Sequence, residues 1–245
     1  MSLTTANLLD IIKKQYFFKL KANIDSFSSL IWIQILGVLF SLGGVGSVGS
    51  FSDYLHVEVK YYSANLVIAF TMIWAFVTAI TITTKPYRNH DFSFVTNRLS
   101  SSIANILFLL TASIIGGVTA MLASNLLKII AYFLFNEQLF TIQSGVGEFA
   151  IGISVTVLYL FCISALGYFI GTTVQISKLF IFVFPALFFG SVFFEAAVEG
   201  EFLNKFFKFY FFEPSLLLCI VKIALTTSLL FLAAISVLQR MEVRR

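Results

Sequence analysis

Charged residues are scarce in this sequence. Asp, Glu, Lys and Arg make up only 11% of its 245 residues, whereas soluble proteins use roughly a quarter. Apolar residues make up 59%, and the mean hydropathy is +0.95. This composition excludes a soluble globular domain. It also excludes a disordered or collagen-like chain, because disorder requires low hydrophobicity and collagen requires glycine at every third position.

The sequence also lacks the motifs of several enzyme classes. It contains no G-x-x-x-x-G-K-[ST] motif, so it has no P-loop for a nucleotide. Its two histidines, His56 and His90, cannot build a histidine-based metal site, and Cys162 and Cys219 have no C-x-x-C spacing. No Asp, Glu or His lies deep in an apolar stretch to act as a general base. We therefore expect no enzyme activity, metal or cofactor of its own, and no nucleic-acid partner.

Stretches without charge divide the chain into membrane spans. Four of them, 26–52, 61–84, 99–127 and 149–177, exceed the roughly 20 residues that a helix needs to cross the hydrocarbon core. Two shorter stretches are each extended by one lysine, Lys178 or Lys222, whose ammonium can reach the membrane surface. We predict an all-α integral membrane protein, because membrane strands would show alternating segments of about ten residues. The six predicted spans lie near 27–50, 62–83, 102–124, 148–171, 176–194 and 216–238.

The distribution of Lys and Arg predicts the orientation of the spans. Cytoplasmic loops carry the excess of these residues in multi-pass proteins. The loops on one side of the membrane contain four Lys residues: Lys60, Lys128, Lys205 and Lys208. The loops and chain ends on the other side contain eleven Lys and Arg residues: Lys13, Lys14, Lys19, Lys21, Lys85, Arg88, Arg98, Lys178, Arg240, Arg244 and Arg245. Both termini are therefore expected in the cytoplasm.

Residues 1–26 precede the first span and have a helical pattern. Apolar residues recur four positions apart and form one stripe, with Asp10, Lys14 and Lys21 on the opposite side and Lys19 beside the stripe. The stripe consists of Leu8, Ile12, Tyr16, Leu20 and Ile24. This pattern predicts an amphipathic helix at the inner membrane surface.

The inner loop between spans 2 and 3 is unusually aromatic. Pro86 ends span 2, and Asp91 can begin a short helix that places Phe92 and Phe94 on different sides. A solvated connector would not need these rings, so a helix that contacts a cytoplasmic partner is one interpretation. The other is a loop that lies on the lipid headgroups through its aromatic residues, Tyr87 included.

Two further features lie toward the outer side of the predicted membrane domain. Residues 195–214 are rich in phenylalanine, which predicts that this connection lies in the outer leaflet. Lys222 lies some six residues inside the last span. It is either a functional charge within the membrane or a lysine whose side chain reaches the surface. The course of 125–147 is left open, as a continued helix or a break at Asn125.

With these features the chain resembles the six-span permease subunits of ABC-2 type transporters. In that family an elbow helix precedes span 1, a coupling helix between spans 2 and 3 docks into an ATPase subunit, and the connection of spans 5 and 6 is partly re-entrant. The matching stretches here are 6–24, 85–99 and 195–214. The family pattern P-x-x-x-x-S-G-x-x-x-P…N-P is matched loosely, with Glu195 and Glu213 replacing its second proline and its asparagine.

The resemblance implies a partner as well as a fold. Two cytoplasmic ATP-binding subunits would carry the ATP and Mg, and the permease would form a homodimer or pair with another permease. The residues expected to couple to the ATPase are Lys85, Tyr87, Arg88, Asp91, Phe92, Phe94 and Arg98.

Size and composition are similar to those of permeases that export, or confer immunity to, amphipathic bacterial peptides, such as bacteriocin-immunity permeases and phenol-soluble modulin exporters. In the family, spans 2 and 5 line the dimer interface, where aromatic rings suit an apolar helix or a lipid tail. The expected pathway residues are Phe70, Trp74, Phe180, Phe184 and Phe188. Alternatively, these rings face lipid or neighbouring helices.

The expected function is ATP-driven export of an amphipathic or hydrophobic peptide across the bacterial plasma membrane. The same machinery could instead export a lipid or a hydrophobic drug. A third alternative is a non-transporting membrane anchor or sensor for a cytoplasmic partner. The cargo, the pairing of permeases, and the choice between export and immunity stay open.

Overall fold

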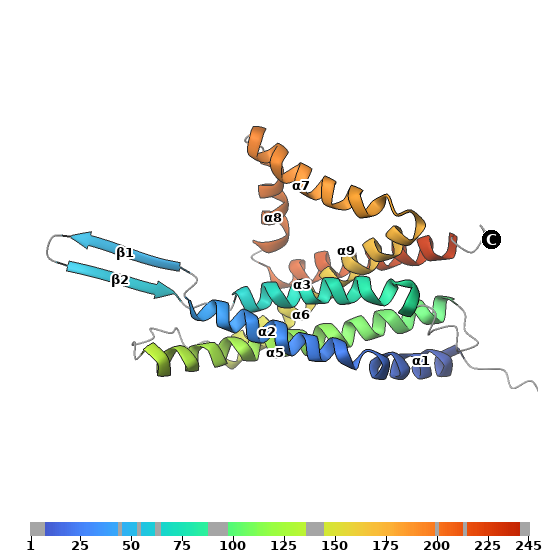
Figure 1. Ribbon diagram of the computed structural model, residues 1–245, viewed down its shortest axis with the longest axis horizontal. Helices are drawn as coiled ribbons and strands as arrows, with labels where there is room; N and C mark the ends of the chain where they lie inside the picture. Colours follow the sequence, from blue (N-terminus) through green and yellow to red (C-terminus); the bar gives the residue numbers. More distant parts are fainter. Residues whose placement is uncertain are drawn as a thin grey trace, which may run out of the picture.

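The structure, a computed structural model, describes residues 8–43, 46–52, 55–61, 65–87, 98–135, 145–198, 201–212 and 215–240. Figure 1 shows a bundle of long helices with a β-hairpin projecting from one end. The elements in chain order are α1 (Leu8–Ala22), α2 (Ile24–Leu42), β1 (Gly46–Ser52), β2 (Leu55–Tyr61), α3 (Asn65–Thr83), α5 (Arg98–Phe135), α6 (Val146–Ile176), α7 (Phe180–Val198), α8 (Phe202–Phe211) and α9 (Leu216–Arg240).

Five of the described helices are long and apolar enough to cross a membrane: α2, α3, α5, α6 and α9. A helix satisfies its own backbone hydrogen bonds, which is what the hydrocarbon core requires. The prediction that the chain is a multi-pass membrane protein built mainly of helices is therefore confirmed.

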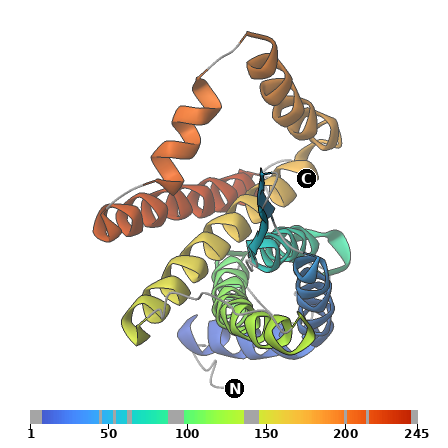
Figure 2. The same cartoon turned by 90° about the vertical axis from the view of Figure 1, so that its left-hand side faces the viewer.

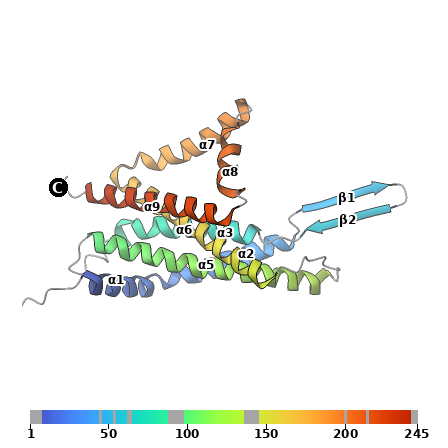
Figure 3. The same cartoon turned by 180° about the vertical axis from the view of Figure 1, so that it is seen from behind.

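The predicted end of span 1, near residue 50, is wrong, because the chain leaves the helix in the connection after α2. That helix ends at Leu42, and residues 46–50, expected to complete span 1, belong to strand β1. Strands β1 and β2 pair antiparallel in a register that joins Gly46 to Tyr61 and Ser52 to Leu55. The hairpin extends beyond the helices in both side views (Figures 1 and 3). Glycine disfavours helix at this point, and alternating valines suit strands.

Helix α5 is much longer than the span predicted near 102–124. It runs unbroken from Arg98 to Phe135 and passes through Asn125 without a break. Its 38 residues correspond to about 57 Å at 1.5 Å per residue, which exceeds the ~30 Å of the hydrocarbon core. Part of α5 must therefore lie beyond the bilayer core and is available to pack against other elements.

The fifth predicted span, near 176–194, corresponds to α7 (Phe180–Val198). Its described apolar stretch, Phe180–Glu195, is shorter than the five long helices. Helix α7 contacts α6 and α8, and an end-on view shows α7 and α8 standing away from the bundle (Figure 2). Helices α6 and α9 run in the same direction along the bundle (Figures 1 and 3). The segment between them, α7 with α8, must therefore return the chain along the length of the bundle.

The most extensive helix contact joins α3 and α6. Gly167 and Gly171 on α6 form a G-x-x-x-G pair that faces α3. A Cβ added at Gly167 would lie 2.6 Å from the Phe76 carbonyl oxygen, and one added at Gly171 would overlap Thr83 Oγ1. Small residues allow such close backbone approach between membrane helices. The α3–α6 distance therefore depends on these two glycines.

Substitution Gly167→Leu is expected to lower stability by about 1–3 kcal/mol, because the larger side chain forces α6 away from α3. Thermal unfolding of the purified protein in detergent measures the effect. Gly190→Leu in α7 is the matched control, since a Cβ there meets nothing within 4 Å among the described residues. Equal melting temperatures for Gly167→Leu and wild type would contradict the α3–α6 packing.

Candidate functional site

A buried polar cluster lies between α1, α5 and α6. Lys19 of α1 is only 7% exposed, and its Nζ donates to Asn105 Oδ1 at 2.5 Å and to Ser101 Oγ at 3.4 Å, both on α5. Asn105 Nδ2 in turn donates to the Tyr168 hydroxyl of α6 at 3.4 Å. These contacts connect three helices through one lysine and one asparagine.

The face of α1 that packs against protein is largely polar. Ile12, Gln15, Lys19 and Asn23, each three or four residues from the next, are the buried residues of this stretch. The sequence pattern predicts the apolar stripe of this helix with Lys19 beside it, but it does not predict that the polar residues are buried. They can be buried because the long α5 lies alongside α1 and supplies polar partners such as Ser101 and Asn105.

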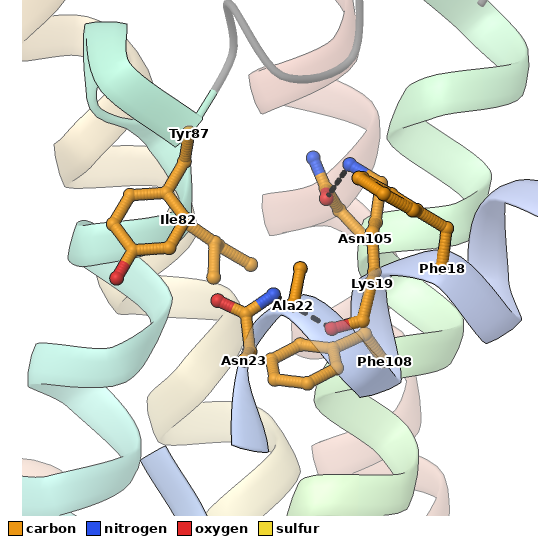
Figure 4. A pocket seen from close by; sticks show the side chains of 8 residues that line it. All are labelled: Phe18, Lys19, Ala22, Asn23, Ile82, Tyr87, Asn105 and Phe108. Carbon is orange, nitrogen blue, oxygen red and sulfur yellow. Dashed lines mark hydrogen bonds between the residues drawn. The ribbon is translucent and has the colours of Figure 1, made fainter. Parts of the chain in front are cut away.

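A cavity of about 60 Å³ adjoins this cluster. Figure 4 shows its polar groups, Lys19, Asn23 and Asn105, between aromatic and aliphatic walls. Asn23 Nδ2 donates to the Lys19 carbonyl at 2.8 Å, whereas Asn23 Oδ1 is buried and has no hydrogen-bond partner among the described residues. The lining residues are Phe18, Lys19, Ala22, Asn23, Ile82, Tyr87, Asn105 and Phe108.

The segment expected to couple to an ATPase is described only at its two ends. Lys85 is exposed, and Tyr87 is exposed at the rim of the cavity. Arg98 is the first residue of α5. The remaining predicted coupling residues, Arg88, Asp91, Phe92 and Phe94, lie outside the described part of the chain, so the predicted short helix stays a prediction.

The predicted pathway residues on α3 pack within the bundle. Phe70 is half-buried and stacks on Phe40 of α2, with ring centroids 5.9 Å apart. Trp74 is 4% exposed, and its Nε1 donates to the Ser26 carbonyl and to Ser29 Oγ, each at 3.0 Å. Trp74 is thus a core residue that holds α3 against α2, and a role in a pathway stays a prediction.

The predicted pathway residues on α7 are more accessible. Phe180 and Phe184 are half-buried with ring centroids 5.8 Å apart, and Phe188 is 65% exposed. Because α7 stands away from the bundle that contains α3 (Figure 2), one chain does not bring the two aromatic groups together.

Lys222 contacts the connection between α7 and α9. Its Nζ lies 3.9 Å from the centroid of the Phe209 ring and donates to the Phe209 carbonyl of α8 at 3.5 Å. The Tyr159 hydroxyl of α6 donates to the Tyr210 carbonyl at 2.5 Å. Both contacts hold the last turn of α8, and a cation there interacts favourably with the carbonyl end of the helix. The side chain of Lys222 therefore extends toward α8.

Lys19→Met is expected to destabilise the protein by about 1–3 kcal/mol, because Asn105 Oδ1 then loses its charged donor in a buried position. The double variant with Asn105→Leu should lose less than the sum of the single losses. Thermal unfolding in detergent measures all three variants. Lys21→Met, at an exposed position of the same helix, should have little effect, and strict additivity would contradict the coupling.

Lys222→Met is expected to loosen α8, because the cation–π contact and the carbonyl contact are both lost, at a cost of about 1 kcal/mol. Hydrogen exchange of the α8 amides should become faster by roughly fivefold. Lys205→Met is the control, since Lys205 forms an exposed pair with Glu201 at 2.9 Å within this segment. Unchanged exchange in Lys222→Met would show that Lys222 does not hold α8.

Comparison with known proteins gives no match: no family model, no curated protein and no solved structure is similar to this chain.

Proposed function

We propose that this chain is the membrane subunit of an ATP-driven exporter of the ABC-2 type, located in the bacterial plasma membrane with both termini in the cytoplasm. It pairs with a second permease, either a copy of itself or a related chain, above two ATP-binding subunits that supply ATP and Mg. The cargo is an amphipathic or hydrophobic peptide.

The observation that carries the proposal is the course of the chain between α6 and α9. These helices run in the same direction, so α7 acts as a sixth crossing element that stands apart from the other five. The start of α1, the end of α9 and the described ends of the 85–98 segment lie at the same end of the bundle, opposite the hairpin (Figure 1). Such an arrangement suits a motor protein that binds at one end.

The distribution of aromatic residues favours an apolar cargo. Helix α7 exposes Phe182, Phe188, Phe193 and Phe194, each by at least 65%. The rings on α3 lie in another part of the same chain, so a pathway lined by both helices needs two chains. Two-chain assembly also covers apolar surface that one chain leaves exposed.

Co-purification with the P-loop ATPase encoded by the neighbouring gene tests the proposal. The expected result is a stable complex whose ATP turnover increases with amphipathic helical peptides. Reversing charge at Lys85, Arg88 and Arg98 should weaken ATPase binding by about tenfold or more, because complementary charges guide such contacts. Lys205→Glu with Lys208→Glu, in the connection at the other end, is the matched control.

Failure to bind or stimulate any P-loop ATPase would contradict the proposal. Binding of a cytoplasmic partner without transport of any compound would indicate a membrane anchor. The exposed rings of α7 also favour a second candidate, export of a lipid or hydrophobic drug. Reconstituted vesicles distinguish the two, because the true cargo is the compound that raises ATP turnover.

A further inference from the structure

Helix α1 is held to the bundle mainly through polar side chains. Its buried residues are Ile12, Gln15 and Lys19, so only one of the three is apolar. Among the described helices α1 contacts mainly α5, on the side where Lys19 donates to Asn105 and Ser101. Burial of a polar side chain is favourable only when the side chain is hydrogen-bonded. The stability of the α1–α5 contact therefore depends on how well Gln15 and Lys19 are partnered.

Gln15 is buried without a hydrogen bond. It is 1% exposed, and neither its Oε1 nor its Nε2 has a partner among the described residues. Asn23 Oδ1, two turns further along the chain, is also buried and unpartnered in the described part of the structure. Each of these atoms gives up its hydrogen bond to water when α1 docks and receives none in return. The polar atoms on the buried face of α1 thus disfavour the docked position.

The backbone between α1 and α2 is suited to a hinge. Helix α1 ends at Ala22 and α2 begins at Ile24. Asn23 between them has φ −110° and ψ 28°, outside the helical region. Hinges are commonly a few residues at the ends of elements that absorb a change in φ and ψ. Rotation at Asn23 therefore redirects α1 and leaves α2 intact.

A released α1 has a favourable position at the membrane surface. Phe18 and Asn23 line a cavity together with Ile82, the penultimate residue of the membrane-spanning helix α3, so α1 lies at the level where that helix ends (Figure 4). Amphipathic helices with lysines lie at the membrane surface with their apolar side in the lipid. Water and headgroups there can reach the Gln15 amide. The apolar stripe available for this position consists of Leu8, Ile12, Tyr16, Leu20 and Ile24.

We propose that α1 is a hinged segment that exchanges between two positions, docked on α5 as in the structure and released onto the membrane surface beside the bundle. Asn23 is the hinge, and the hydrogen bond from Lys19 to Asn105 holds the docked position. The unpartnered amide of Gln15 keeps the two positions close in free energy. This inference is independent of the proposed export function, because the exchange requires neither an ATPase nor a cargo.

Hydrogen exchange of the α1 amides, in the full-length chain reconstituted in lipid nanodiscs, measures the released fraction. Gln15→Leu should slow this exchange by about tenfold, because the docked position then contains no unpartnered amide at residue 15. Lys19→Met should speed it up by a similar factor, because the hydrogen bond that holds the docked position is lost. Unchanged or faster exchange in Gln15→Leu would overturn the proposal.

Gln34→Leu is the matched control for Gln15→Leu. Gln34 is also a buried glutamine, 8% exposed, but it donates to Thr119 Oγ1 and to the Gly116 carbonyl. Its substitution should leave the exchange of the α1 amides unchanged. An equal slowing in both variants would show a general effect of added apolar surface and would contradict the role of Gln15.

Cysteine labelling provides a second readout that does not depend on the folding of Gln15→Leu. In a chain with Cys162 and Cys219 replaced by alanine, Gln15→Cys should react with a water-soluble maleimide, because release of α1 exposes this position. Thr172→Cys, at a position of α6 that is 0% exposed, should react at about one tenth of that rate or less. Equal rates at the two positions, whether slow or fast, would show that α1 does not move separately from the bundle.

Discussion

The close approach of α3 and α6 is the constraint on which the rest of the bundle depends. Gly167 and Gly171 bring the α6 backbone against Phe76 and Thr83 of α3, without room for a larger side chain. Helix association in lipid relies on such packing, because lipid tails are as apolar as the helix surfaces. With this distance fixed, Tyr168 lies in the core beside Ala79, and α5 and α9 pack around the same cluster.

Polar side chains determine which helices pack together in the bundle, because apolar packing alone does not select one neighbouring helix over another. Gln34 of α2 donates to Thr119 Oγ1 at 2.9 Å and to the Gly116 carbonyl at 3.3 Å, both on α5. Gln175 of α6 donates to the Thr83 carbonyl of α3, and Asn105 joins α5 to α1 and α6. Each of these hydrogen bonds connects particular helices, whereas apolar contacts are satisfied by many neighbours or by lipid. The same principle places Lys19 at the junction of α1 with α5.

Sequence reasoning found the membrane helices but only part of the candidate site. Asn105 stands out in the sequence as one of the few strongly polar residues of the spans, and its need for a polar partner is a signal that could have led to Lys19. Lys222 is more conspicuous in the sequence than Lys19, because it interrupts an apolar stretch. Lys19 lies in a segment with several lysines, where nothing local distinguishes the one that is buried. For Trp74, likewise, nothing in the neighbouring sequence shows that its indole donates a hydrogen bond to α2 instead of facing a pathway.

The sequence by itself determined where the apolar helices lie. The free energy of transferring a segment from water into the membrane is a sum over some 20 neighbouring residues, so it can be judged without knowledge of the fold. Only the tertiary structure decided that residues 46–52 and 55–61 pair as strands, that α5 reaches Phe135, and that α7 stands apart from the bundle. It also decided that the polar face of α1 is buried. Burial of a single side chain depends on partners such as Asn105, 86 positions away along the chain, and their proximity is a property of the packed helices.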